Sequence, residues 1–333
     1  TGTEVPGNAE VQHLVCEIKV GGVILFERSV ATHEPRNLVS PDQVKRLTSD
    51  LQALARGCAG RPLFIAADNE GGQVMRLSTR LGYPPAPSAA EMGRSDVATT
   101  RLEARRMGET LRAAGINWNL APVVDVAINP LNPAVVKPGR TFSADPEQVI
   151  AHARAFIEGM HDAGVLTALK HFPGHGSSQA DTHAGFTDVT DTADLRLELA
   201  PYRALIAENL ADSVMTAHVF NRGLDPWDPA TLSRYTVARI LRGQLGYRGV
   251  VVSDDLLMGA IVKHYGIEEA AVDALAAGVD VLLISQNSLN SQPRAVQRAI
   301  AAVEAAVAQG SLSRSRVVAA LDHVAALRRR LGP

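Results

Sequence analysis

The chain has few cysteines, no long hydrophobic run and almost no net charge, and each of these absences excludes a class of protein. Its only cysteines, Cys16 and Cys58, are too few for a disulfide framework and lack metal-ligand spacing, so we expect buried free thiols. No apolar stretch reaches the roughly 18 residues that a membrane span needs. A net charge of -2 without a long basic run gives no signature of nucleic-acid binding.

The chain is long and apolar enough to form one large core. It has 333 residues, 46% of them hydrophobic, and no low-complexity linker or charge block divides it. We therefore expect a single domain over residues 1–333, with no further domain after Pro333, and a monomer. The sequence begins with Thr1 instead of methionine, so the compartment, cytoplasmic or exported, is not readable from its start.

Short β-branched apolar runs alternate with longer helical patterns along the sequence. The strand candidates are residues 22–26, 63–67, 117–120 with 123–126, 166–169, 213–217, 249–253 and 279–284. The helix candidates are residues 40–55, 98–114, 146–163, 195–208, 236–244, 267–277 and 292–309. This alternation predicts βαβ units and a parallel sheet. Polar residues at nearly every strand end favour an α/β fold of the (β/α)8 TIM-barrel type over an open sheet, which would want a G-x-G-x-x-G turn.

The most informative stretch follows the strand candidate at 166–169. It reads K-H-F-P-G-H-G over residues 170–176, and Asp181 and His183 lie shortly beyond. The proline and glycines break regular structure, which places reactive side chains on a loop at a strand end. An aspartate two residues before a histidine can accept its ring N–H and raise its basicity, so His183 suits acid and base roles in turn. The alternative is a solvated histidine capped by its neighbour.

Other strand ends carry further polar side chains, and a barrel would bring them to one face. Asp254 and Asp255 follow the strand candidate at 249–253. Because side chains alternate along a strand, one of the two would face the barrel mouth as a nucleophile and the other would serve structure. Hydrogen-bonding groups that suit sugar hydroxyls, or else structural ion pairs, are Asp68, Arg140, Lys170 and His171.

The histidines of this face also suggest a metal site. Pro173 and Gly174 separate His171 from His175, so the two histidines do not share a helical face. Lys170 would place a positive charge beside the cation. We therefore expect no metal and no cofactor.

Several motifs, in order, resemble those of bacterial β-N-acetylhexosaminidases of glycoside hydrolase family 3. The loop at 170–183 is similar to the family pattern K-H-F-P-G-H-G…D-[ST]-H. The other matching segments are residues 68–74 (D-x-E-G-G-x-V), 121–125 (A-P-V-x-D), 140–142 (R-[ST]-F), 215–218 and 253–258. The resemblance covers roughly residues 21–284 and departs from the family pattern at Asn69, Gln73 and the segments 27–36 and 135–139, where the aglycone or the pocket wall would lie.

The resemblance implies a (β/α)8 barrel and a retaining, two-step glycosidase mechanism. Asp254 matches the nucleophile that forms a covalent glycosyl-aspartate, and His183 matches the acid/base that Asp181 orients. The residues that match the pocket for the N-acetylglucosamine unit are Asp68, Arg140, Lys170, His171 and Met258. The implied function is a retaining exo-β-N-acetylglucosaminidase that releases terminal N-acetylglucosamine from cell-wall (peptidoglycan) fragments or chitin-type oligosaccharides.

Four alternatives stay open from the sequence. A β-glucosidase or β-xylosidase of the same superfamily would take its acid/base carboxylate from elsewhere and ignore His183. A phosphorolytic variant would use phosphate as acceptor, because a neutral histidine repels an anion less than a glutamate does. A metal-dependent hydrolase would use the histidines as ligands, and a sugar-binding barrel would lack turnover.

Overall fold

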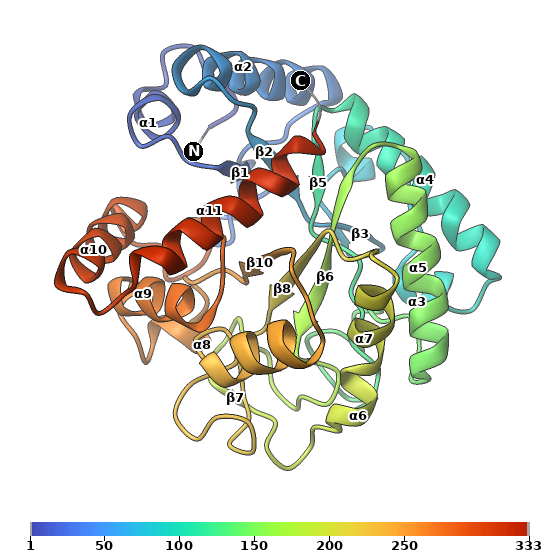
Figure 1. The fold of residues 1–333 in the computed structure, drawn as a ribbon. Helices are drawn as coiled ribbons and strands as arrows, with labels where there is room; N and C mark the ends of the chain where they lie inside the picture. Colours follow the sequence, from blue (N-terminus) through green and yellow to red (C-terminus); the bar gives the residue numbers. More distant parts are fainter. Residues whose placement is uncertain (1, 332–333) are drawn as a thin grey trace.

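The computed structural model describes residues 2–331, and a curled parallel sheet lies at its centre (Figure 1). The six strands, in spatial order, are β1 (Gly22–Ile24), β2 (Phe64–Ala67), β5 (Trp118–Asn119), β6 (Leu166–Phe172), β8 (Ser213–Thr216) and β10 (Val250–Ser253). All five neighbouring pairs are parallel. Every residue from β2 to β10 in this sheet is buried, as expected for parallel strands covered by helices. The predicted α/β class and parallel sheet are confirmed.

The closed eight-stranded barrel is not formed by the strands of residues 2–331. The candidate strand at 279–284 contributes one isolated bridge, between Val252 and Val281. Backbone bonds around that bridge join the segment to the end of β10, from the Ser253 N–H to the Val281 carbonyl (2.9 Å) and from the Leu256 N–H to the Leu283 carbonyl (3.0 Å), and side chains add further bonds. Leu283 donates its N–H to Ser253 Oγ (2.9 Å), and Ser285 donates its N–H to Asp255 Oδ1 (3.1 Å). The hydrogen-bonded sheet is therefore a half-barrel.

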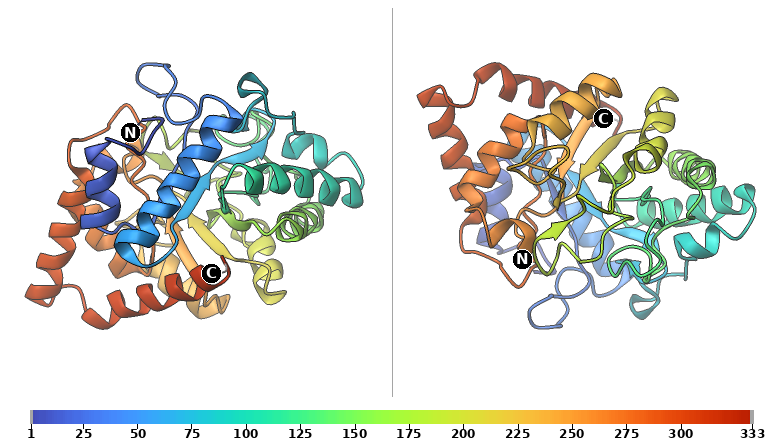
Figure 2. Two further views of the ribbon diagram at one scale, coloured as in Figure 1. Left: turned by 90° about the horizontal axis from the view of Figure 1, so that it is seen from above. Right: turned by 90° about the horizontal axis from the view of Figure 1, so that it is seen from below.

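Helices cover the outside of the sheet (Figure 2). The longer ones are α2 (Pro41–Ala59), α4 (Val97–Ala113), α5 (Pro146–Asp162), α7 (Ala200–Ala207), the π-helix η3 (Tyr235–Gln244), α9 (Ile267–Ala277) and α10 (Ala295–Gln309). The predicted helix at 195–208 divides into α6 (Leu195–Glu198) and α7. Pro201, which has no N–H to donate, lies in the first turn of α7, so a new helix begins there.

Shorter elements connect these helices and strands. They are α1 (Ala9–Gln12), the π-helix η1 (His13–Glu17), β3 (Asn69–Gly71), β4 (Val74–Met75), η2 (Thr79–Leu81), α3 (Ala89–Met92), β7 (Thr187–Asp188), β9 (Val219–Phe220) and α8 (Gly259–Val262). β7 and β9 form a separate parallel pair. This small sheet lies on the loops that follow β6 and β8, beyond the carboxyl ends of the central strands. No helix within residues 2–331 is both long and apolar enough to cross a bilayer.

The C-terminal helix α11 (Arg314–Arg329), which the sequence patterns did not predict, crosses in front of the sheet in Figure 1. Leu327 of α11 packs into a cluster of strand residues that includes Phe64 and Trp118. Arg316 Nη2 bonds Asp280 Oδ1 (2.6 Å) just before the bridged segment. The helix therefore covers the amino-terminal ends of the strands and leaves the carboxyl ends open for function.

The two cysteines form a disulfide, so the expectation of free thiols was wrong. Cys16 lies in η1 and Cys58 in the last turn of α2, and their Cα atoms are 5.0 Å apart. The two residues are 42 positions apart in the sequence. Only the packing of η1 against α2 brings them together, and spacing alone does not reveal such a pair.

The disulfide is expected to stabilise the fold by restricting the unfolded chain. For a closed loop of this length, the chain-entropy argument predicts that Cys16→Ser with Cys58→Ser lowers the free energy of unfolding by about 4 kcal/mol. Chemical denaturation with and without a reductant measures this difference. The double variant serves as its own control, because reductant must leave its stability unchanged. Equal stability of the oxidised and reduced wild-type protein would contradict the prediction.

Candidate active site

Most of the predicted site residues gather where the central strands end. Lys170 and His171 lie near the carboxyl end of β6, and Asp254 follows β10 directly. Asp68 follows β2, and Arg140 reaches the same place from the long segment after β5. The fold thus brings together side chains that are far apart in the sequence, at the end of a parallel sheet where sites are usually built.

A buried cluster of four charges forms the floor of the site. Lys170 Nζ lies 3.0 Å from Asp68 Oδ1 and 2.7 Å from Glu70 Oε1. Arg140 binds the same Glu70 carboxylate through Nε and Nη2, both at 2.8 Å. Glu70 is not among the predicted site residues, although it lies within one of the matched motifs. Each charge has at least one partner of opposite sign, which makes their burial tolerable, and the less buried Arg76 also pairs with Asp68 Oδ2 at 3.4 Å.

Each charge in this cluster holds its neighbours in the ionised state. Burial alone would raise the pKa of Glu70, but the adjacent Arg140 and Lys170 lower that pKa well below its usual range. Burial would likewise lower the pKa of Lys170, and Asp68 and Glu70 together raise it above normal. The side chain of Asp68 is more exposed to solvent than that of Glu70, at 17% against 3%. Asp68 can therefore accept hydrogen bonds from a molecule outside the cluster.

His171 is held by a buried aspartate. Its Nδ1 lies 2.7 Å from Asp125 Oδ2, which turns Nε2 toward Arg140 Nη2 at 3.4 Å. Asp125 Oδ1 also accepts the backbone N–H groups of His171 (3.2 Å) and His175 (2.8 Å). Asp125 thus positions the start of the loop. It lies in a matched motif, but only these contacts reveal its role as a support.

The structure distinguishes the two adjacent aspartates after β10. Asp255 is buried and accepts the N–H groups of Leu257 and Ser285 (3.1 Å each) as well as the Ser285 hydroxyl, so its carboxylate is fully engaged. Asp254 accepts one bond from the Asp255 N–H (2.7 Å). Burial raises the pKa of Asp254, but the surrounding histidines, His218 first, lower it below its usual range. An ionised, lightly bonded carboxylate therefore faces the site.

His183 is coupled to Asp181 as the spacing predicted. His183 Nδ1 lies 2.7 Å from Asp181 Oδ1, and the same oxygen accepts the His183 backbone N–H at 2.9 Å. The His183 side chain is 66% exposed, which leaves Nε2 free for proton transfer. The bond to Asp181 raises the pKa of His183, and the charge of Asp254 raises it further. The His183 carbonyl accepts the N–H of Gly259 at 3.3 Å, so the loop lies against the segment that follows Asp254.

His175, which lies between His171 and His183 in the sequence, anchors the loop. His175 is buried, its Nδ1 lies 2.8 Å from Ser178 Oγ and its Nε2 lies 3.2 Å from Thr182 Oγ1. Burial lowers the pKa of His175 to about 4, so the ring stays neutral at physiological pH. Because Thr182 is buried and precedes His183, this anchor fixes the base of the exposed Asp181–His183 pair.

Glu198 supports the loop from below, and no sequence pattern pointed to it. Its side chain is buried against Gly174, where an added Cβ would meet the Glu198 Cβ at 2.6 Å. Glu198 Oε1 accepts the N–H of Ser177 at 3.2 Å. Burial raises the pKa of Glu198 to about 7. Glu198 therefore supports the loop through its packing against Gly174 and its bond to the Ser177 backbone.

Two further residues lie at the edge of this constellation. Met258 is buried at the start of α8, where its N–H bonds the carbonyl of Asp255 (2.9 Å), so its predicted contact with a sugar stays a prediction. His218 is buried with Nε2 3.0 Å from the Asp255 carbonyl and Nδ1 2.8 Å from Thr231 Oγ1. Within the described part of the chain, no three His, Cys, Asp or Glu side chains form a group that could hold a metal ion.

Comparison with known proteins identifies relatives over nearly the whole chain. The family described as "Glycosyl hydrolase family 3 N terminal domain" matches residues 3–327. A β-hexosaminidase from Alkalilimnicola ehrlichii is 38% identical over 284 residues, which cover 83% of this chain and 77% of that protein. A β-hexosaminidase from Idiomarina loihiensis is 37% identical over 290 residues, covering 85% of this chain and 81% of that protein.

Solved structures show the same fold. A glycoside hydrolase family 3 β-N-acetylglucosaminidase from Paenibacillus sp. str. FPU-7 superposes with a TM-score of 0.89 at 38% identity, covering 99% of this chain. The chain spans only 60% of that protein's length. A β-N-acetylhexosaminidase from Beutenbergia cavernae DSM 12333 superposes with a TM-score of 0.84 at 32% identity, covering 97% of this chain and 93% of the other.

The coupling of His183 to Asp181 predicts a measurable titration. The His183 ring proton should titrate with a midpoint above the ordinary value of 6.5, because the carboxylate stabilises the imidazolium. Asp181→Asn should move the midpoint down toward 6.5, and Asp191→Asn, at an exposed position of the same region, should not. Proton NMR of the histidine rings over pH 4 to about 9 measures both. An unchanged midpoint in Asp181→Asn would disprove the coupling.

Proposed function

The chain belongs to glycosyl hydrolase family 3, and we propose that it is a retaining exo-β-N-acetylglucosaminidase. Its substrates in this proposal are cell-wall (peptidoglycan) fragments or chitin-type oligosaccharides with a terminal N-acetylglucosamine. The relatives that carry the name β-hexosaminidase support the activity class. The observation that carries the proposal is the pairing of an ionised Asp254 with an exposed, aspartate-coupled His183 above a polar floor.

In the first step, the carboxylate of Asp254 attacks the anomeric carbon. The lowered pKa of Asp254 keeps the carboxylate ionised near neutral pH, as a nucleophile requires. The bond from the anomeric carbon to the glycosidic oxygen breaks, and its electron pair leaves with that oxygen. Protonated His183 donates a proton from Nε2 to the departing oxygen, because Nδ1 is held by Asp181. The products are a glycosyl-aspartate, a free aglycone and a neutral His183.

In the second step, neutral His183 acts as the base. Nε2 accepts a proton from a water molecule whose oxygen attacks the anomeric carbon, and the ester bond to Asp254 breaks with release of the carboxylate. The sugar leaves with its original anomeric configuration, and both residues return to their starting protonation states. The raised pKa of His183 favours the protonated ring that the first step needs, and the same Nε2 takes a proton back in the second step.

The buried charge cluster supports recognition of the sugar. Asp68, Lys170, Arg140 and His171 present acceptors and donors at fixed positions, because each is already locked by an ion pair or by Asp125. Such groups can bond vicinal hydroxyls without reorganising, which favours binding and orientation.

Phosphorolysis is a second candidate that the histidine favours. When the glycosyl-aspartate forms, His183 is neutral, so an anionic acceptor meets less repulsion than beside a glutamate. The 66% exposure of the His183 side chain leaves room for such an acceptor. Faster turnover with added phosphate and a sugar 1-phosphate product would identify this variant.

The nucleophile assignment predicts a large loss of activity. Asp254→Asn should reduce cleavage of aryl β-N-acetylglucosaminides by about 1000-fold or more, because the amide cannot form the ester intermediate. Asp191→Asn, at an exposed position, is the matched control. Steady-state assays with and without a chelator, on paired N-acetylglucosaminide and glucoside substrates, test the assignment. Full activity in Asp254→Asn would move the nucleophile elsewhere, and preference for the glucoside would favour the β-glucosidase alternative.

The acid role of His183 predicts a dependence on the leaving group. His183→Ala should slow cleavage of a saccharide leaving group by about 100- to 10,000-fold, because that oxygen needs a proton as it departs. With a dinitrophenyl leaving group, which departs readily as an anion, the first step should slow far less. His13→Ala, in η1 and away from the site, is the control. An equal loss across leaving groups would argue against the acid role.

A further inference from the structure

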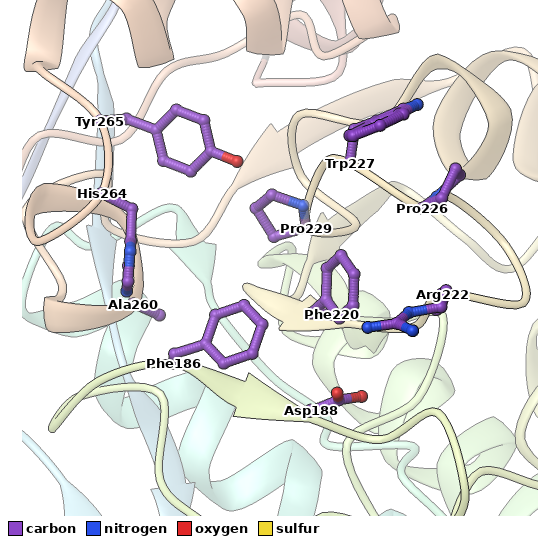
Figure 3. Close-up of a pocket in the computed structure, with 10 residues that line it drawn as sticks. All are labelled: Phe186, Asp188, Phe220, Arg222, Pro226, Trp227, Pro229, Ala260, His264 and Tyr265. Carbon is purple, nitrogen blue, oxygen red and sulfur yellow. The ribbon is translucent and has the colours of Figure 1, made fainter.

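A cavity of about 310 Å³ lies beside the loop that carries His183, and none of the residues assigned to the site above lines it (Figure 3). Its walls come from three places: β7 and the residue before it, β9 with the segment that follows, and α8 with the two residues beyond Lys263. The volume suits one ring-sized ligand. The lining residues are Phe186, Asp188, Phe220, Arg222, Pro226, Trp227, Pro229, Ala260, His264 and Tyr265.

The cavity and the catalytic loop are parts of one packed unit. Phe186, a wall of the cavity, is three residues from His183, so their Cα atoms lie within about 11 Å. Ala260, another wall, donates its N–H to the Thr182 carbonyl at 3.1 Å. Lys263 Nζ binds the carbonyl of Ala184 at 2.6 Å. A ligand in the cavity would therefore lie against the same loop that carries the proton donor of the proposed reaction.

The lining is aromatic and unusually open. The Phe186 ring packs against Phe220, with ring centres 5.2 Å apart, and against His264 at 5.6 Å. Yet Phe186 is 50% exposed, and Trp227 is 82% exposed. Figure 3 shows these rings and Tyr265 disposed around a common space. Large apolar rings left in water around a concavity indicate a binding surface, and flat rings suit the apolar face of a pyranose.

Polar groups with spare bonding capacity lie on one side of the cavity. The guanidinium of Arg222 makes no hydrogen bond or ion pair to another residue in the described part of the chain. Asp188 uses Oδ1 to bind Thr190, at 2.8 Å to the N–H and 2.5 Å to the hydroxyl, and its side chain lines the cavity together with Arg222 (Figure 3). A donor and an acceptor beside stacking rings match the hydroxyl groups of a sugar.

We propose that this cavity binds the sugar unit on the leaving-group side of the scissile bond. The inference rests on the proposed glycosidase function and adds the part of the protein that selects the aglycone. Trp227 and Phe186 hold the ring of that unit by stacking, and Arg222 and Asp188 bond its hydroxyls. Because the catalytic loop forms one wall, occupation of the cavity places the glycosidic oxygen near His183. The enzyme should then favour substrates whose aglycone is itself a sugar.

The test compares substrates with and without a leaving-group sugar. N-acetylglucosaminyl fluoride has no aglycone that reaches the cavity, whereas the β-1,4-linked N-acetylglucosamine disaccharide does. Trp227→Ala and Arg222→Ala should each lower kcat/KM for the disaccharide by about 2- to 10-fold, mainly through KM, and leave the fluoride unchanged. The exposure of Trp227 makes its replacement compatible with folding. Leu321→Ala, a similarly exposed apolar residue on α11, is the control and should change neither value.

A binding measurement separates this inference from the proposed function. Trp118, the other tryptophan, is 4% exposed, so quenching of intrinsic fluorescence by the disaccharide would report on Trp227. The proposal is supported if the disaccharide quenches the Asp254→Asn protein in a saturable way and does not quench the double variant that also carries Trp227→Phe. Cleavage of the fluoride by the wild type establishes the glycosidase, whatever the cavity does. The proposal for the cavity would be overturned if kcat/KM for the disaccharide, divided by kcat/KM for the fluoride, were the same in Trp227→Ala, Leu321→Ala and the wild type. The absence of quenching would also overturn it.

Discussion

The arrangement of the site depends on how the buried ammonium of Lys170 is neutralised. An unpaired charge at 2% exposure would cost several kcal/mol, so the fold must supply carboxylates at the same depth. Asp68 and Glu70, just after β2, supply these carboxylates. Glu70 also accepts hydrogen bonds from Nε and Nη2 of Arg140. These pairs join the ends of β2 and β6 to the segment after β5. The polar floor is therefore rigid before any ligand binds.

The loop after β6 combines a fixed base with an exposed tip. Buried Asp125 and His175 hold its first half through bonds to backbone and side chains, and the buried Thr182 ends this fixed part. The next residue, His183, is exposed and coupled to Asp181. A proton donor that contacts a substrate needs an accessible side chain. A donor with a fixed orientation needs rigid support from the residues before it. The same segment continues into the wall of the aromatic cavity.

The two ends of the sheet serve different purposes. At the amino-terminal ends, the buried carboxylates of Asp212 and Asp280 bind side chains of α5 and α11, with His161 Nε2 at 2.7 Å from Asp212 and His323 Nδ1 at 3.1 Å from Asp280. Arg330, directly after α11, pairs with Asp212 as well. These contacts close that end and contribute stability. The carboxyl ends carry the ionised, partly exposed groups, as parallel α/β folds generally arrange their sites.

The sequence by itself determined the features that depend on near neighbours. Apolar runs alternating with helical patterns predicted the parallel sheet, and the two-residue spacing of Asp181 and His183 predicted their hydrogen bond, because both depend on short-range geometry. Only the tertiary structure decided which partner each group meets across the fold. It turned Asp254 toward the histidines and engaged Asp255 with backbone N–H groups, and it joined residues 281–285 to the end of β10 through one bridge with a few backbone and side-chain bonds. The remaining long-range outcomes are the Cys16–Cys58 disulfide, the place of Glu70 and the docking of α11. Such contacts join positions tens of residues apart, and they are set by packing that no local pattern records.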